Sequence, residues 1–294
     1  MTTTFLLGGD LPVHRIGYGA MRLTDSPDMR RGAAAPVWRP PTDRADAVAV
    51  LRRAIELGVN LIDTADSYAL GANEELVADA LHPYRDDLVI ATKIGNTRPG
   101  PDEWVPLGHP AYLRQQAELS LRRLRVDHLD LLYLHRVDPA VPFADQIGAL
   151  HRLRAEGKVR HIGLSEVSVA ELAAAQAITP IAAVQNRYNL IDREHEPVLE
   201  YAAAHGIAFV PYFPIAMGAH AGPDSPVATV AAELGATPGQ VALAWLLRRS
   251  EVVVPIPGTV SPAHLAENVG ALDLALSDDR FARLSALGDR ANAA

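Results

Sequence analysis

The sequence predicts a closed (β/α)8 barrel, an α/β fold in which eight parallel strands alternate with helices. Eight short apolar runs have the β-branched and aliphatic character of buried strands, and amphipathic helical periods lie between them. Strict alternation of this kind is typical of parallel strands joined by crossover helices. No stretch of the 294 residues resembles a domain linker, so we expect residues 1–294 to form a single domain.

The elements follow in order along the chain. A short N-terminal β-hairpin is expected around Gly8, Gly9 and Asp10, which are turn-forming residues. The expected strands are 14–17, 59–63, 88–93, 129–135, 160–164, 182–185, 207–212 and 252–256. The expected helices are 44–57, 73–81, 113–124, 143–153, 168–177, 194–205, 238–248 and 262–269. An open doubly wound sheet is less consistent, because Gly17-Tyr18-Gly19-Ala20-Met21-Arg22 has only the first two glycines of a dinucleotide-binding turn.

Composition restricts the function. A formal net charge of −8 argues against a nucleic-acid partner, since phosphate binding needs a clustered cationic surface. The absence of cysteine excludes disulfides, thiolate nucleophiles and cysteine-bound metals, and the scattered histidines give no reason to expect a metal. With no apolar run long enough for a membrane helix and no leader-like start, we expect a cytoplasmic protein without a membrane partner.

In a barrel of this kind, function resides at the carboxyl ends of the strands and in the loops that follow them. Three loops are long enough to build a pocket: 21–42, 94–110 and 213–225. The first two carry Trp38 and Trp104, which either hold long loops together or line the pocket.

Four titratable residues are expected to converge at this end of the barrel. The second strand delivers Asp63 and then Tyr68, the third ends in Lys93 and the fourth ends in His135. Taken singly, a lysine at a strand end commonly extends to water and a rim histidine is commonly structural. Together they can carry out a reaction.

The chemistry of this group favours protonation of an oxygen. We expect Lys93 to lower the pKa of the Tyr68 hydroxyl, and Asp63 to keep Lys93 charged and in place. His135 would donate a hydrogen bond to a substrate carbonyl oxygen. A hydride for the carbonyl carbon must come from a cofactor, because no side chain supplies one.

The chain resembles the aldo-keto reductase family in a series of motifs in the expected order, between residue 5 and residue 273. These are Asn-Leu-Ile-Asp-Thr-Ala-Asp-Ser-Tyr, Ala-Thr-Lys, Tyr-Leu-His, Gly-Leu-Ser-Glu-Val-Ser, Val-Gln-Asn-Arg-Tyr-Asn, Pro-Tyr-Phe-Pro-Ile, and Pro-Ile-Pro-Gly-Thr followed by Glu-Asn. The resemblance implies an NAD(P)H-dependent reductase with Tyr68 as proton donor, Lys93 and Asp63 as its tuning pair and His135 as the residue that orients the substrate.

The resemblance also implies a cofactor site. Ser165 and Gln185 would bind the nicotinamide carboxamide, and Tyr212 would stack on the nicotinamide ring. The remaining cofactor positions that it implies are Gly19, Ala20, Met21, Asp63, Phe213, Pro214, Ile215, Gly258, Thr259, His264, Glu267 and Asn268.

Three positions depart from the family pattern. Glu166 stands where many members have asparagine, and Gly258 and His264 stand where a lysine and an arginine commonly bind the adenosine 2′-phosphate. Thr259, Ser261 and the helix N-terminus at residue 262 could bind a phosphate instead, although Ser261 is also suited to a simple N-cap. We expect NADPH rather than NADH.

The combination of Gly-Tyr-Gly-Ala-Met-Arg-Leu with His-Arg-Val-Asp-Pro is similar to a bacterial branch of small-aldehyde reductases that includes pyridoxal reductases. The expected substrate is therefore a small-molecule carbonyl, either a pyridoxal-like aldehyde or a ketone of a sugar or natural product. Two rival functions share these residues. One is a lyase that forms a Schiff base on Lys93, and the other is a non-catalytic NADP(H)-binding regulatory subunit. A metal-dependent hydrolase ranks last, since no His-x-His follows the first strand.

Overall fold

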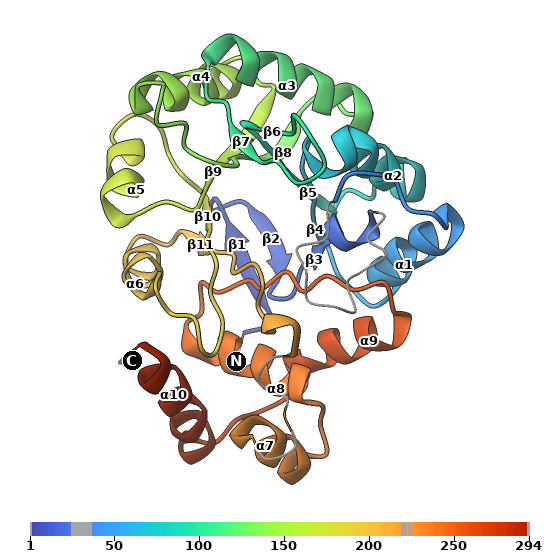
Figure 1. Ribbon diagram of the computed structural model, residues 1–294, viewed down its shortest axis with the longest axis vertical. Helices are drawn as coiled ribbons and strands as arrows, with labels where there is room; N and C mark the ends of the chain where they lie inside the picture. The colour runs from blue at the N-terminus through green and yellow to red at the C-terminus, as the bar shows by residue number, and fades with distance from the viewer. Residues whose placement is uncertain (1, 25–36, 219–221, 223–224, 293–294) are drawn as a thin grey trace.

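The computed structural model describes residues 2–24, 37–218, 222 and 225–292. Parts of the loops 21–42 and 213–225 therefore lie outside the described residues. Figure 1 shows the strands at the centre of the molecule and the helices in a ring around them. The predicted barrel is confirmed as an architecture, with its seven-stranded sheet curled into the wall of the barrel.

The sheet is parallel throughout, and its strand order is β11-β10-β9-β8-β5-β4-β3. The strands are β3 (Tyr18–Gly19), β4 (Leu61–Asp63), β5 (Val89–Ile94), β8 (Leu129–Leu134), β9 (Val159–Ser165), β10 (Ala183–Gln185) and β11 (Ala208–Phe209). The crossover helices are α1 (Arg44–Glu56), α2 (Ala72–Leu81), α3 (Pro110–Leu124), α4 (Phe143–Ala155), α5 (Val169–Gln176), α6 (Glu196–Ala204), α8 (Pro238–Arg249) and α9 (Pro262–Gly270).

Several elements differ from the prediction. The first barrel strand is β3, beyond the expected 14–17, because His14 ends the hairpin strand β2. The eighth expected strand, 252–256, is extended without forming a regular ladder. It closes the barrel through Phe209 N to Val252 O at 2.8 Å on one side and Gly17 N to Pro255 O at 3.0 Å on the other.

Other elements were not predicted. They are the small hairpin β6 (Asn96–Thr97) and β7 (Val105–Pro106), the helices α7 (Pro226–Leu234) and α10 (Asp278–Asn292), and the short 3-10 turns η1 (Ala20–Leu23), η3 (Tyr68–Gly71), η4 (Ala216–Gly218) and η5 (Ala271–Asp273). Within the described residues no single helix is long and apolar enough to span a membrane; only the bent pair α7 and α8, at 95°, meets the length and composition test together.

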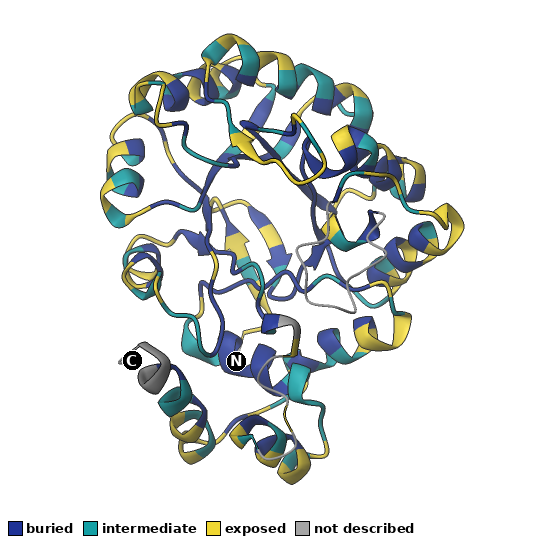
Figure 2. Cartoon of the chain, viewed as in Figure 1, coloured by how far each residue is buried: buried dark blue, intermediate teal, exposed yellow. Residues whose placement is uncertain are grey.

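The core has two layers because side chains of a strand alternate between its two faces. In β4, Ile62 packs outward against the helices, whereas Leu61 packs into the barrel interior. Figure 2 shows that the strands of the barrel wall are buried, whereas the outer faces of the surrounding helices are exposed. The strands therefore read as apolar runs until they reach their polar carboxyl ends.

The predicted hairpin is confirmed as β1 (Thr4–Leu7) and β2 (Leu11–His14), and it closes the amino end of the barrel. Leu7, Leu11 and Val13 join the interior apolar layer. At the hairpin turn, Asp10 pairs with His161 near the start of β9, at 2.6 Å. The cavity described below opens at the opposite, carboxyl end of the barrel.

Arg15 links this hairpin to residues 247–253, which lie between the end of α8 and the eighth segment of the barrel. Its side chain is buried and donates to the carbonyl oxygens of Leu247 at 2.6 Å, Ser250 at 2.5 Å and Val253 at 3.2 Å. Arg15 thus satisfies carbonyl groups at the carboxyl end of α8 and one carbonyl group of the irregular eighth segment.

We expect Arg15→Leu to lower the free energy of unfolding by about 2–4 kcal/mol, because several buried carbonyl groups lose their donor. Urea unfolding measures this difference. Arg53→Leu is the control: Arg53 pairs with Glu56 in solvent, so its loss should cost less than about 0.5 kcal/mol. Equal effects of the two substitutions would contradict a closing role for Arg15.

Candidate active site

The carboxyl ends of three neighbouring strands bring the predicted ionisable residues together. Asp63 ends β4, Lys93 lies near the end of β5 and His135 follows β8. The Lys93 ammonium forms an ion pair with Asp63 Oδ1, donates to Thr64 O at 2.8 Å and lies 3.3 Å from the Tyr68 hydroxyl. The predicted grouping of these residues is thus present in the structure.

Tyr68 is held by an unusual turn. Ala69 and Leu70, which follow it in η3, have φ angles of 48° and 54°, a left-handed conformation that costs non-glycine residues about 1–2 kcal/mol each. The backbone N–H of Ala69 donates to Val37 O at 2.9 Å, which helps to hold the turn. The strained turn fixes where the Tyr68 hydroxyl points.

Burial changes the acid–base properties of this group. It raises the pKa of the Tyr68 hydroxyl, and the Lys93 ammonium opposes that rise without cancelling it. The predicted lowering effect of Lys93 on the Tyr68 pKa is present, but it does not decide the net shift, because desolvation of the phenolate outweighs the attraction of the cation. For Lys93, burial would lower the pKa, but Asp63 and Tyr68 raise it above its usual range.

His135 lies beside Tyr68 and is neutral. The two rings meet edge to face, with centroids 5.9 Å apart. Burial, together with the nearby Lys93 and Arg136 cations, lowers the pKa of His135 well below its usual range. Its Nδ1 lies 3.3 Å from the Ser67 hydroxyl, which leaves Nε2 as the other nitrogen available for a ligand.

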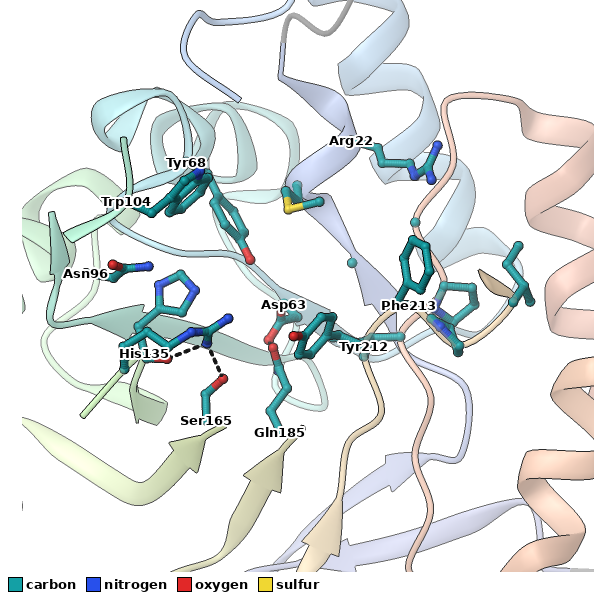
Figure 3. A pocket seen from close by; sticks show the side chains of 18 of the residues that line it. Arg22, Asp63, Tyr68, Asn96, Trp104, His135, Ser165, Gln185, Tyr212 and Phe213 are labelled. Carbon is teal, nitrogen blue, oxygen red and sulfur yellow. Dashed lines mark hydrogen bonds between the residues drawn. The ribbon is translucent and has the colours of Figure 1, made fainter. Parts of the chain in front are cut away.

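Gln185 and Ser165 already have protein partners. The Gln185 amide donates to Asp63 Oδ2 at 2.8 Å, which extends the Lys93–Asp63 network to β10. The Ser165 hydroxyl accepts from Arg136 Nη1 at 3.0 Å. Figure 3 shows these side chains around the cavity, with Tyr212 beside Asp63 and Gln185.

A cavity of about 570 Å³ opens above these strand ends. The predicted residues that line it are Gly19, Met21, Asp63, Tyr68, His135, Ser165, Gln185, Tyr212, Phe213, Pro214, Ile215 and Gly258. Lys93 is buried behind the wall, while Ala20, Thr259, His264, Glu267 and Asn268 are not among the lining residues. The sequence reasoning missed the lining residues Arg22, Asn96, Pro106, Arg136, Ile256 and Pro257.

The structure gives a physical reason for Gly258. A Cβ atom at this position would lie 2.6 Å from Gly19 O and 3.4 Å from Arg22 Cγ. The chain after the eighth segment therefore passes so close to β3 that a side chain at residue 258 would collide with the backbone.

Arg22 lies against Gly258 at the cavity wall, and no carboxylate among the described residues pairs with it. A basic residue directly after the predicted Gly19–Met21 stretch was the signal that could have identified it.

The Glu166 carboxylate contacts protein groups on neighbouring segments. The residue has a left-handed φ of 56°, and its carboxylate accepts from Arg187 N at 2.7 Å and lies 3.7 Å from His195 Nε2. Glu166 is not among the residues that line the cavity.

The residues near α9 satisfy one another locally. The Thr259 hydroxyl accepts from Ser261 N at 3.0 Å, and the Ser261 hydroxyl accepts from His264 N at 3.4 Å. Ser261 is therefore the N-cap of α9, in agreement with the simpler of the two interpretations of this residue.

Comparisons with known proteins agree with this site. A model described as the Aldo/keto reductase family matches residues 15–289. The chain is 45% identical over 280 residues to an uncharacterized oxidoreductase of Schizosaccharomyces pombe, which covers 95% of this chain and 88% of that protein. It is 42% identical over 292 residues to pyridoxine 4-dehydrogenase of Escherichia coli, with 97% and 98% covered.

A solved structure supports the same conclusion. The aldo/keto reductase of Klebsiella pneumoniae, crystallised with NADP and acetate, has a TM-score of 0.81 at 30% identity, with 98% of this chain and 95% of that chain covered. The matches span nearly the whole chain and include the strand ends that form the cavity. The chain belongs to the aldo/keto reductase family.

Proposed function

We propose that this protein reduces an aldehyde or ketone carbonyl to an alcohol with NADPH, and that Tyr68 gives its proton to the carbonyl oxygen. The observation that carries the proposal is the 3.3 Å contact between the Tyr68 hydroxyl and the Lys93 ammonium in the wall of the cavity. A cation at this distance stabilises the phenolate that remains once the proton has left.

Each of the four residues has a distinct task in this proposal. Tyr68 keeps its proton at neutral pH because burial raises its pKa. Lys93 compensates the charge that forms on Tyr68, and Asp63 holds Lys93 in position by the buried ion pair. The neutral His135 donates one N–H to the carbonyl oxygen, which orients the substrate and stabilises charge that develops there.

The residues present fit a nicotinamide dinucleotide. Tyr212 offers an aromatic face beside Gln185 and Ser165, whose polar groups suit the carboxamide. The close approach of Gly19 and Gly258 leaves backbone exposed at the cavity wall, and Arg22 provides a cation for a phosphate group. When bound, the reduced nicotinamide supplies the hydride.

NADPH is the proposed cofactor. Two solved relatives from Klebsiella pneumoniae, each 30% identical to this chain, contain NADP and NADPH. For the adenosine end, we propose the surface formed by Thr259, His264, Glu267 and Asn268 around the start of α9. Ala20, Phe213, Pro214 and Ile215 would contact the cofactor between the two ends.

The structure weakens the Schiff-base alternative. An amine must be neutral and accessible to attack a carbonyl carbon, whereas Lys93 has no exposed surface and its pKa is raised by Asp63 and Tyr68 against the effect of burial. Three partners already occupy its ammonium group. Lys93 is suited to a fixed cation and not to a nucleophile.

The Escherichia coli relative is named pyridoxine 4-dehydrogenase. We therefore propose pyridoxal-like aldehydes as the first substrates to test, with a sugar or natural-product ketone as the alternative. Among the described residues, the only carboxylate in the cavity walls is that of Asp63, which is paired with Lys93. Neutral or anionic carbonyl compounds fit this lining better than cationic ones do.

We expect Tyr68→Phe to reduce the turnover number of aldehyde reduction by a factor of about 100 or more, the usual scale for the loss of a general acid. The dissociation constant of NADPH should change by less than about twofold, because the hydroxyl is not needed to hold the cofactor. Absorbance at the nicotinamide band measures turnover, and quenching of protein fluorescence measures binding.

Tyr201→Phe is the matched control, since the Tyr201 hydroxyl bonds Gln176 away from the cavity. Its turnover should equal that of the unsubstituted protein. Turnover in Tyr68→Phe above about one tenth of the original would contradict the assignment of the acid. A protein that binds NADPH and oxidises none of it with a broad panel of aldehydes and ketones would instead indicate the regulatory subunit.

A further inference from the structure

Trp104 forms the wall of the cavity opposite the cofactor residues. It lies in the β6–β7 hairpin, and its ring meets Tyr68 at a centroid distance of 6.4 Å and 77° and His135 at 6.2 Å and 74°. Figure 3 shows it beside both residues. A substrate whose carbonyl oxygen lies between Tyr68 and His135 must therefore place its adjoining carbon skeleton against this indole.

Arg98 fixes the position of the Trp104 ring. Its guanidinium carbon lies 3.7 Å from the ring centroid, a short cation–π contact. The same guanidinium donates to Glu103 O at 2.9 Å, to Val37 O at 3.2 Å and to Pro101 O. Because the backbone of two segments holds Arg98, the indole is presented as a rigid flat surface and not as a mobile loop side chain.

Asn96 places a polar group without a protein partner at the same wall. The residue is 4% exposed and lines the cavity. Its buried Oδ1 accepts no hydrogen bond from any described residue, and Figure 3 shows the amide nitrogen on the cavity side of the residue. This nitrogen can donate a hydrogen bond to an oxygen atom of a ligand. The lining thus combines a flat apolar surface with one amide group beside the proposed reaction centre.

We infer that Trp104 and Asn96 form a substrate subsite that selects planar aromatic aldehydes carrying a hydroxyl group on the ring. The inference rests on the proposed carbonyl reduction and adds the class of substrate to it. The flat ring packs against the indole, which is already ordered, so little rotamer entropy is lost on binding. The ring hydroxyl bonds to the Asn96 amide, and an analogue that lacks the hydroxyl leaves that amide unpaired.

The first arm of the test compares benzaldehyde with cyclohexanecarbaldehyde, which have rings of similar size but differ in planarity. The ratio of their kcat/KM values is measured in the unsubstituted protein, Trp104→Leu and Trp104→Phe. The intrinsic reactivities of the two aldehydes are the same for every variant, so they cancel when the ratios are compared. Relative to the unsubstituted protein, we expect Trp104→Leu to lower the ratio about tenfold and Trp104→Phe to keep it within about threefold. A ratio that Trp104→Leu changes by less than about twofold would overturn the role of Trp104.

The second arm compares benzaldehyde with 2-, 3- and 4-hydroxybenzaldehyde. In Asn96→Leu, the ratio of kcat/KM for the best hydroxylated isomer to kcat/KM for benzaldehyde should fall about tenfold. If Asn96→Leu changes the preference for none of the hydroxylated isomers, the role of Asn96 is overturned. If the unsubstituted protein reduces no carbonyl compound at all, the proposed function fails and not the subsite alone.

Ser67 lies beside Nδ1, one of the two ring nitrogens of His135. The Ser67 hydroxyl lies 3.3 Å from His135 Nδ1, and both side chains are buried. In a neutral imidazole, the partner of one nitrogen decides which nitrogen carries the proton. We propose that Ser67 is a positioning residue that donates to Nδ1 and thereby places the N–H of His135 on Nε2, toward the substrate.

Nitrogen-15 NMR of the imidazole ring tests this proposal without relying on turnover. We expect the unsubstituted protein and Ser67→Thr to show His135 protonated on Nε2, and Ser67→Ala to show a mixture of the two forms. Turnover in Ser67→Ala should fall about fivefold to tenfold, with recovery in Ser67→Thr. An unchanged His135 spectrum in Ser67→Ala would overturn the proposal whether or not the enzyme is active.

Discussion

The buried ion pair between Lys93 and Asp63 is the contact on which the rest of the site depends. Both side chains are almost fully removed from solvent, 1% and 5% exposed. Breaking such a pair would leave one uncompensated charge in the interior, at a cost of about 3–5 kcal/mol. Hydrogen bonds from the pair reach Tyr68 and, through Gln185, the strand β10. The charge balance of the interior and the position of the proposed acid are therefore set by one network, and neither changes without the other.

The fold supplies this network by closing one end of the barrel and opening the other. The β1–β2 hairpin fills the amino end with Leu7, Leu11 and Val13. Arg15 links the hairpin to the irregular eighth segment. Ionisable residues at the carboxyl ends of the strands then face a cavity with apolar walls, where electrostatic interactions are stronger than in water. The long β5–α3 connection contributes Asn96 and Trp104 to this cavity, so the part of the site that varies most easily contacts the substrate side.

The sequence predicted the fold and the polar strand ends well because both are local signals. An apolar run that stops at Asp63, Lys93 or His135 identifies a strand and its tip together. The net pKa of Tyr68 could not be predicted, since it depends on how far burial outweighs the effect of Lys93. Gly258 appeared to be the loss of a cation, whereas it permits the close approach of Gly19, a contact between residues far apart in the chain. Asn96 lies in none of the motifs, and Arg22 and Ser67 lie in motifs that assign them no role, so the contacts around these three residues are needed to show their importance.

In the proposed reaction, Lys93 makes Tyr68 a usable acid and, in the reverse direction, a usable base. The most direct measurement is the pH dependence of alcohol oxidation in the unsubstituted protein, in Lys93→Met and in the neutral pair Asp63→Asn with Lys93→Met, which avoids an uncompensated buried charge. Oxidation needs the phenolate, so activity should rise as the pH increases through the pKa of Tyr68. We expect this rise to move to higher pH by about one unit or more in both variants. A rise at the same pH in all three proteins would contradict the role of Lys93.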